Sequence, residues 1–480
     1  MLSASKPFTL ILFGASGHLA QLKIYPALYT LALKKRLPDA YTIIGFARTA
    51  MTDDAFKNLV SESVRRDMGT VNEEVLAEFV SHMSYHAGQY DAVDDFATLE
   101  KKISGHEKNW QNPVRLAYLS TPPEVFTSVL HNLCDSNIHV SGKEFRVIVE
   151  KPVGHDLESY HVVRDELKKC FEEHEVYLLD HYLGKEAVRN IYYLRYANPV
   201  VERLFKNTLI HHVEISALEN AGIENRAGYF EPSGTFRDMF QSHLLMMGCL
   251  LTMRLRDSDE FIRESRLEAL KQFYLPPAKS LDDIALQAQY SPGMMGEEPV
   301  AGYLQEKGVA PDSRQNTYAA LALSTRASRW EGVPFFLRSG KRLQKKETRI
   351  TIEFNEPRVA GKNTEPNRLD IILQGEAGMR LHLQTKVGGT EPQFRPLVLE
   401  DPLVCYGDCL PEHALLLLEA IAGNQTWFLS FEEVNTAWRL IDPVQAHLQK
   451  ESTPLHTYPA GSTGPAAADA WIQKNGMKWL

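Results

Sequence analysis

Four side chains that can handle protons and anions lie close together in the sequence: Asp180, His181, Tyr182 and Lys185. They follow an apolar run and precede a predicted helix that begins near Glu186. A histidine, a tyrosine and a lysine at a helix entrance can direct three hydrogen-bond donors and the helix dipole at a phosphate. The aspartate only accepts hydrogen bonds and can orient an imidazole. The block therefore indicates a phosphate-binding site, and a solvated polar loop is the alternative.

His243 is the next candidate for chemistry. It lies in a predicted helix, Phe236–Met253, and shares one apolar face with Met239 and Met246. This spacing is typical of a hydrogen-bonded core histidine, yet an imidazole is also well suited to act as a general base near neutral pH. Asp238 would lie about 140° around the helix from His243, at ~100° per residue, and would flank the ring. The residue pattern leaves both roles open.

A glycine-containing turn directly follows the first predicted strand, Phe8–Phe13. Glycines let the backbone approach a pyrophosphate, and the next helix offers unpaired N–H groups to its charge. The spacing is Gly-x-x-Gly-x-x-Ala, so an ordinary tight turn between strand and helix is the alternative. The turn consists of Gly14, Ala15, Ser16, Gly17, His18, Leu19 and Ala20.

A basic residue directly follows each of two other predicted strands. Arg48 follows Tyr41–Ala47, at the position where a carboxylate would favour NAD and a guanidinium fits the 2′-phosphate of NADP. NADP is therefore the favoured cofactor and NAD the weaker alternative. Lys151 follows Phe145–Glu150 and would project as a point charge from the edge where parallel sheets bind ligands. A solvated arginine and a surface lysine are the alternatives.

The elements that must position these groups alternate between short apolar runs and helical stretches. This rhythm predicts an α/β domain with a doubly wound, mostly parallel sheet and helices on both faces. In such a sheet the carboxyl ends of the strands meet at one edge, which would collect the turn, Arg48 and Lys151. The predicted strands are Phe8–Phe13, Tyr41–Ala47, Arg115–Leu119, Phe145–Glu150 and Val176–Asp180.

The pattern changes after Asn198 to strands of period two, which predicts an α+β domain with a large, mainly antiparallel sheet. We therefore expect domains at residues 1–198 and 199–480. Thr457–Ala468 is rich in proline, glycine, serine and alanine and is expected to form a surface tail. The predicted strands are Thr208–Ala217, Arg349–Phe354, Leu369–Leu373 and Met379–Val387, and further helices are expected at Glu412–Ile421 and Phe431–Leu448.

Composition excludes several classes of protein. The 480 residues carry 52 Lys and Arg against 61 Asp and Glu, a net charge of −9, which argues against nucleic acid or an anionic membrane as partner. The sequence has no run of about 20 apolar residues and no signal-peptide pattern. The five cysteines show no zinc-type spacing, and a metal shared by Cys405 and Cys409 is disfavoured, so we expect structural thiols, no metal and a cytoplasmic location.

The motifs, in their order along nearly the whole chain, resemble the glucose-6-phosphate dehydrogenase family. They are GASGHLA followed by Lys23-Ile-Tyr-Pro26, Gly45-Phe-Ala-Arg48, EKPVG, DHYLGKE, GYFEPSGTFRDMFQSHLL and GVPFFLRSGKRL. The DHYLGKE block is the most specific of them. The resemblance implies a Rossmann domain joined to an α+β domain, with glucose 6-phosphate as substrate and NADP as hydride acceptor.

The resemblance also implies roles for individual residues. His243 looks like the general base and Asp180 like the carboxylate that orients it. Residues similar to those of the substrate site are Lys151, His181, Tyr182, Lys185, Glu219, Asp238, Lys341, Lys346 and Gln374. Those similar to the cofactor site are the seven turn residues with Lys23, Arg48, Tyr90 and Lys151, and Pro152 is expected to set its loop through a cis bond.

The chain departs from the family pattern at His18, Gln21 and Leu22, which bears on the choice between NADP and NAD. Two other functions remain as alternatives: a different Rossmann-type sugar dehydrogenase, and a non-catalytic sensor of sugar phosphate or NADPH. The family forms homodimers and homotetramers, so one of these assemblies is expected.

Overall fold

The computed structural model describes residues 4–480 except 141, 225, 358–363, 392 and 404. The described chain divides into two compact units. The first comprises residues 1–185, 259–263 and 408–432, and the second comprises 186–258, 264–407 and 433–480. The division after Lys185 lies before the predicted boundary at Asn198, and two later segments of the chain return to the first unit.

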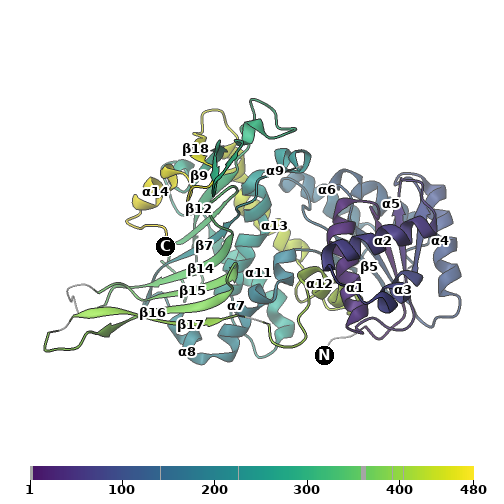
Figure 1. The fold of residues 1–480 in the computed structure, drawn as a ribbon, viewed down its shortest axis with the longest axis horizontal. Helices are drawn as coiled ribbons and strands as arrows, with labels where there is room; N and C mark the ends of the chain where they lie inside the picture. Colours follow the sequence, from purple (N-terminus) through teal and green to yellow (C-terminus); the bar gives the residue numbers. More distant parts are fainter. Residues whose placement is uncertain (1–3, 141, 225, 358–363, 392, 404) are drawn as a thin grey trace. The chain divides into compact units, whose positions relative to one another are not determined.

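The first unit is built on a parallel sheet with the strand order β3-β2-β1-β4-β5-β6. Its central strands are buried and mainly apolar, as expected when helices cover both faces, and Thr9 and Arg115 are their buried polar residues. Figure 1 shows these helices packed around the sheet. The strands are β1 (Phe8–Phe13), β2 (Tyr41–Ala47), β3 (Met83–Ala87), β4 (Val114–Leu119), β5 (Phe145–Val149) and β6 (Val176–Leu178).

The helices of the first unit connect these strands, and one of them comes from much later in the chain. They are α1 (Tyr25–Leu33), α2 (Asp53–Met68), α3 (Glu73–Ser81), α4 (Val93–Glu107), α5 (Phe126–Asp135), α6 (Leu157–Lys168) and α12 (Glu412–Ala422). A π-helical segment, η1 (Ala20–Ile24), precedes α1, and a 3₁₀ turn, η4 (His181–Gly184), follows β6.

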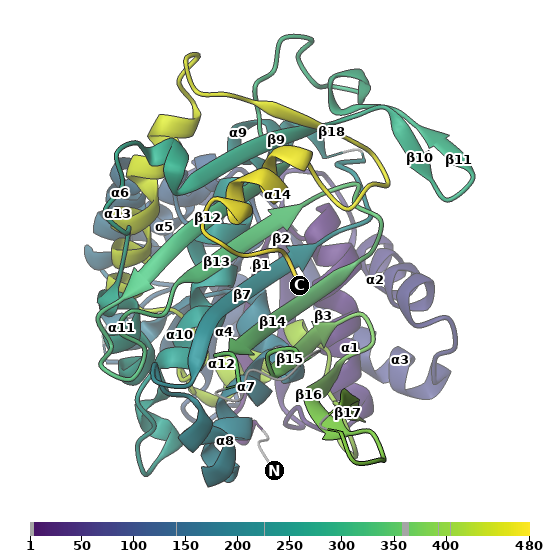
Figure 2. The same cartoon turned by 90° about the vertical axis from the view of Figure 1, so that its left-hand side faces the viewer.

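The second unit is built on a large, mostly antiparallel sheet. Its order is β17-β16-β15-β14-β7-β13-β12-β9-β18, with β8 paired to β12, and Figure 2 shows these strands side by side. Within this sheet, the pairs β7–β13 and β9–β18 are parallel, and the other described pairs are antiparallel. The strands are β7 (Ile210–Leu218), β8 (Phe273–Tyr274), β9 (Ala285–Ser291), β12 (Tyr318–Thr325), β13 (Phe335–Gly340), β14 (Glu347–Phe354), β15 (Arg368–Gln374), β16 (Gly378–Lys386), β17 (Phe394–Pro402) and β18 (His456–Pro459); β10 (Gly293–Met295) pairs with β11 (Glu298–Val300) outside the sheet.

Helices pack on both faces of this sheet, α14 on the face turned to the viewer in Figure 2. They are α7 (Glu186–Ala197), α8 (Pro199–Leu204), α9 (Ala227–Met239), α10 (Leu245–Thr252), α11 (Ile262–Gln272), α13 (Phe431–Leu448) and α14 (Ala466–Gln473), with a π-helical segment η5 (Phe240–Leu244) between α9 and α10. The predicted fold class is confirmed. Within the described ranges, no helix combines the length and the apolar character that a membrane crossing needs.

Two sequence-based expectations are wrong. The expected surface tail, Thr457–Ala468, includes most of β18 and the start of α14, and Tyr458 is buried at 1% exposure. Its prolines and glycines end the strand and begin the helix, with Pro465 as N-cap.

The cysteines expected as thiols include a disulfide between Cys134 and Cys170, which the adjacent packing of α5 and α6 brings together. Cys405 and Cys409 are also disulfide-bonded, so the cysteine argument for a reducing compartment fails.

Candidate active site

The glycine turn after β1 has the backbone that only glycine adopts readily. Gly14 has a φ of 81°, and its N–H donates to the Phe46 carbonyl at 2.9 Å. A Cβ atom on Gly14 would lie 2.5 Å from the Ser120 carbonyl oxygen. The N–H of Gly17 donates back to the Gly14 carbonyl at 2.8 Å. The turn is thus wedged between the carboxyl ends of β2 and β4, where a ligand phosphate can approach its backbone.

Side chains from the following helices hold the turn in place. The Tyr25 hydroxyl donates to the Ala15 carbonyl at 2.5 Å, and the Gln21 amide donates to the Ser16 carbonyl at 3.0 Å. His18 is exposed, Leu19 is half-buried and Ala20 begins η1. Gln21, which departs from the family pattern, therefore supports the turn.

Arg48 and Tyr90 lie beside the same turn. The Arg48 guanidinium lies 5.6 Å from the centroid of the Tyr90 ring, and its own side chain is exposed after the end of β2. Burial raises the pKa of Tyr90, while the charge of Arg48 and a hydrogen bond with the Gly14 backbone oppose that rise. The structure therefore brings the predicted cofactor residues Gly14, Arg48 and Tyr90 together.

The predicted phosphate block forms η4 and its two flanking residues. Asp180 is fully buried, and its Oδ1 accepts the N–H of Tyr182 at 2.9 Å, which caps the turn. The Lys185 ammonium lies 3.8 Å from the centroid of the Tyr182 ring. The His181 ring stacks against the ring of His413 with centroids 6.1 Å apart. One short turn thus gathers the donors His181, Tyr182 and Lys185.

Sequence reasoning gave no role to His413, which lies on α12 beside this block. Burial lowers the pKa of His413 to about 4; Lys23 and Lys185 act in the same direction, and Glu412 opposes them. The imidazole is therefore neutral at physiological pH, although the carboxylate of Glu412 lies 3.8 Å from its Nδ1. Only its place on the buried face of a predicted helix could have indicated it.

Glu150, between β5 and Lys151, is the second group that sequence reasoning assigned no role. It accepts a hydrogen bond from the Tyr118 hydroxyl at 2.5 Å, and its Oε1 lies 3.9 Å from His413 Nε2. Burial raises the pKa of Glu150 to about 7; Asp180 adds to this rise, and Tyr118 and Lys151 oppose it. The peptide bond that follows Lys151 is cis, as expected from Pro152.

In the second unit, a broken helix carries Asp238 and His243. Gly234 has a φ of 64° and a ψ of 171°, which interrupts α9. The restarted helix is anchored by Asn316, whose side chain accepts the N–H of Phe236 at 2.9 Å. His243 lies in η5 at 1% exposure, and Asp238 accepts a hydrogen bond from the Tyr229 hydroxyl at 3.3 Å.

The remaining predicted substrate residues lie at one end of the large sheet. Glu219 follows the end of β7 and forms an ion pair with Lys341, which follows the end of β13. Lys346 is exposed and directly precedes β14, while Gln374 ends β15 opposite Thr348. The strand register therefore brings Glu219, Lys341, Lys346 and Gln374 to one edge, carried by neighbouring strands.

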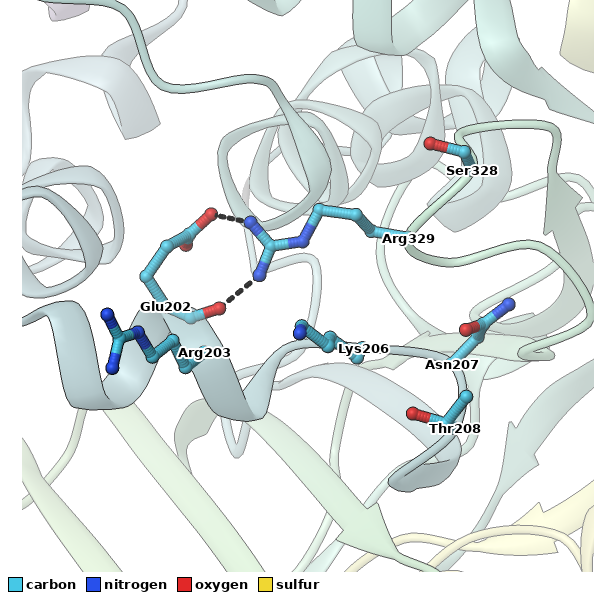
Figure 3. Close-up of a pocket in the computed structure, with 7 residues that line it drawn as sticks. All are labelled: Glu202, Arg203, Lys206, Asn207, Thr208, Ser328 and Arg329. Atoms are coloured by element: carbon cyan, nitrogen blue, oxygen red, sulfur yellow. Dashed lines mark hydrogen bonds and ion pairs between the residues drawn. The ribbon is translucent and has the colours of Figure 1, made fainter.

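A cavity of about 510 Å³ lies elsewhere in the second unit, around the start of β7. Figure 3 shows the Arg329 guanidinium turned toward Glu202, with which it forms an ion pair. None of the predicted site residues is among those that line it, which are Glu202, Arg203, Lys206, Asn207, Thr208, Ser328 and Arg329. We do not assign this cavity to the candidate active site.

Family models cover nearly the whole chain. Residues 11–190 match "Glucose-6-phosphate dehydrogenase, NAD binding domain", and residues 192–480 match "Glucose-6-phosphate dehydrogenase, C-terminal domain". A glucose-6-phosphate 1-dehydrogenase of Chlamydia pneumoniae is 35% identical over 98% of this chain and 96% of its own. One from Mycolicibacterium smegmatis is 32% identical over 98% of this chain and 97% of its own.

Solved structures agree with the sequence relatives. A glucose-6-phosphate dehydrogenase in complex with its substrate glucose-6-phosphate superimposes with a TM-score of 0.90, at 30% identity and over 100% of both chains. Glucose-6-phosphate 1-dehydrogenase from Mycobacterium avium has a TM-score of 0.84 at 28% identity, over 99% of both chains.

Proposed function

Because the chain belongs to the glucose-6-phosphate dehydrogenase family, we propose that it oxidises D-glucose 6-phosphate at C1 to 6-phospho-D-glucono-1,5-lactone. This is the first step of the oxidative pentose phosphate pathway. His243 accepts the proton of the C1 hydroxyl as the C1 hydrogen leaves with its electron pair. NADP, held at the glycine turn, would supply the hydride acceptor.

The residues of the first unit fit a dinucleotide. The wedged glycine turn presents backbone N–H groups to a pyrophosphate, and the lack of a Cβ lets Gly14 lie against the Ser120 backbone at the end of β4. Arg48 holds the 2′-phosphate beside Tyr90. Lys23 and the remaining residues of the turn complete this surface, and Lys151 reaches both cofactor and sugar.

The observation that carries the proposal is the cationic cluster around η4. Lys185 directly follows η4, and η1, which carries Lys23, packs against the same helix, α12, as η4 does. The two positive charges therefore lie on elements around α12, although the chain is net acidic. In our proposal His181, Tyr182 and Lys185 bind the sugar phosphate there. Contacts to the sugar come from Lys151, Glu219, Asp238, Lys341, Lys346 and Gln374.

Asp180 is the positioning residue for the base. In our proposal its carboxylate holds the His243 imidazole in the tautomer that can accept the proton and stabilises the imidazolium that forms. The burial of both side chains supports this role, because an aspartate that water does not reach interacts strongly with a new positive charge.

A spectrophotometric assay tests the function. Purified protein is mixed with glucose 6-phosphate and either NADP or NAD, and the absorbance of the reduced nicotinamide is followed. We expect reduction of NADP, and His243→Asn is expected to lower kcat by about 10²–10⁴-fold with little change in substrate affinity. His131→Asn, at an exposed histidine of α5, is the matched control and should keep full activity.

Absence of reduction with glucose 6-phosphate and either cofactor would contradict the proposal. Binding of glucose 6-phosphate without turnover would point to the sensor, and turnover of another sugar only would point to a different sugar dehydrogenase. An unchanged kcat in His243→Asn would leave His243 as a core histidine.

We further propose a cytoplasmic homodimer or homotetramer. The phosphates of substrate and cofactor keep both on the side of a membrane where they are made, which supports a cytoplasmic location. The net charge of −9 gives no support to a nucleic acid partner. Light scattering coupled to gel filtration measures the assembly.

A further inference from the structure

Three metal-binding side chains meet where β7 begins and β14 ends: His211, His212 and Glu353. His211 Nδ1 and His212 Nδ1 lie 3.0 Å apart. Glu353 Oε1 lies 3.5 Å from His211 Nδ1 and 3.7 Å from His212 Nδ1. Glu219 follows the opposite end of β7, about 25 Å away along the strand at ~3.3 Å per residue. The cluster is therefore remote from the sugar-binding edge of the same sheet.

A β-bulge explains how two consecutive residues can face the same point. In a regular strand, neighbouring side chains point to opposite faces of the sheet. Here His212 pairs with Glu353 and Ile210 pairs with Phe354, so His211 is an extra residue. Bulges turn side chains in this way and occur often beside functional sites. The bulge therefore aims the His211 ring at the ring of His212.

The other nitrogen of His212 is already engaged. Nε2 lies 3.3 Å from a carboxylate oxygen of Glu214, a buried residue that also accepts the backbone N–H of Leu480 at 3.2 Å. Because Glu214 only accepts hydrogen bonds, His212 carries its proton on Nε2. Its Nδ1 therefore presents a lone pair to the cluster. A carboxylate behind an imidazole is the usual support of a metal-binding histidine.

We propose that His211, His212 and Glu353 bind a divalent transition-metal ion of the zinc class. Points separated by 3.0, 3.5 and 3.7 Å share a centre about 2.0 Å from each, and zinc binds imidazole nitrogen at about 2.0–2.1 Å and carboxylate oxygen at about 2.0–2.2 Å. One ion thus fits all three atoms without moving them. Two nitrogens and one oxygen suit zinc or a similar ion rather than calcium or magnesium.

The exposure of the three ligands indicates where the ion enters and where water completes its coordination. The His211 side chain is 46% exposed, whereas those of His212 and Glu353 are 2% and 18% exposed. The ion therefore enters past His211, and water completes a fourth position on that side. By joining β7 to β14, the ion would stabilise the folded chain as free metal rises above its dissociation constant.

Calorimetric titration of the full chain, without an affinity tag, with Zn²⁺ tests the site. We expect His211→Ala to bind one equivalent of Zn²⁺ fewer than the wild type. His131→Ala removes an exposed histidine outside the cluster and should bind as many equivalents as the wild type. Co²⁺ is the spectroscopic probe, and His211→Ala should lose the visible absorption of one bound Co²⁺ ion. Glu214→Gln should weaken binding by about 10–100-fold while keeping the ligands.

A wild-type chain that binds no Zn²⁺, or a His211→Ala variant that keeps the same number of equivalents, would overturn the proposal. A proton shared between the rings would then occupy the space instead of a metal. Since His211 is half exposed, its variant is expected to fold, and an unchanged circular dichroism spectrum serves as the check. Glu353→Gln provides a second ligand variant, which should also lose the equivalent. The outcome is independent of the function proposed above.

Discussion

Replacement of Glu150 by glutamine is expected to change how the stability of the protein depends on pH. Glu150 is 8% exposed, and burial is the largest cause of its raised pKa. A glutamine has nearly the same shape and still accepts the hydrogen bond from the Tyr118 hydroxyl. It does not titrate, so the variant removes one proton equilibrium and little else.

The size of the effect follows from the two pKa values. The pKa of Glu150 rises from 4.5 to about 7 in the folded chain, and each pH unit corresponds to ~1.4 kcal/mol, which gives about 3 kcal/mol. Between these values the folded state keeps a proton that the unfolded state releases. The free energy of unfolding therefore falls as pH rises from about 4.5 to about 7, and it levels off above that range.

Urea unfolding of the wild type and Glu150→Gln, followed by circular dichroism from pH 4.5 to 8.5, measures this. The stability of the variant relative to the wild type should rise by about 3 kcal/mol across the range, whatever the constant offset. Tyr118→Phe is the matched control, because it removes the hydrogen bond that lowers the pKa of Glu150 and should move the change to higher pH. A difference between variant and wild type that stays constant with pH would show that folding does not raise the pKa of Glu150.

Three further outcomes are expected. Between pH 6.5 and 4 the unfolded chain takes up a proton on His413 that the folded chain does not, so the wild type loses stability as pH falls. His413→Gln should remove this loss, and the free energy of unfolding at pH 6.5 and at pH 4 measures it. Arg48→Ala should raise the KM for NADP but not that for NAD, and equal effects in initial-rate assays would exclude a 2′-phosphate contact. Gly14→Ala should lower the unfolding free energy by ~1–3 kcal/mol, more than Gly69→Ala, because both have positive φ but only Gly14 lacks room for a Cβ.

Strands could be predicted from the sequence where a mainly apolar run or a period-two alternation is clear. β1 and β2 have the predicted bounds because a strand buried on both faces is mainly apolar, and the alternation of period two located β7, β14, β15 and β16 to within two residues at each end. β3 contains a serine and a histidine, and β17 is exposed and contains a proline, so neither shows a clear period. Local composition also does not predict β18, because its partner strand β9 is far away in the chain.

The candidate site shows the same limit. The glycine turn and the η4 block are local in sequence, so their residue types alone indicated their chemistry. His413 reaches that block from α12, more than two hundred residues later. Glu150 stood next to a predicted site residue, but its pKa is raised by burial and by the charge of Asp180, against the hydrogen bond from Tyr118 on the neighbouring strand. Contacts of this kind come from the fold and leave no spacing to recognise.

Helical periodicity alone leaves the role of His243 open. The spacing predicts one α-helix over Phe236–Met253, with Met239 and Met246 on the same face as His243. The structure instead has a π-helical segment, Phe240–Leu244, in which hydrogen bonds join residues five apart. Each π turn rotates the residues after it relative to those before it, so regular α-helical spacing does not decide which side chains share a face across this segment. Met239, His243 and Met246 are all buried. Such segments are frequent at functional sites, and η1 after the glycine turn, which carries Lys23, is a second one in this chain. The burial of His243 is therefore equally consistent with a base sheltered from water, and the kcat of His243→Asn separates the two roles.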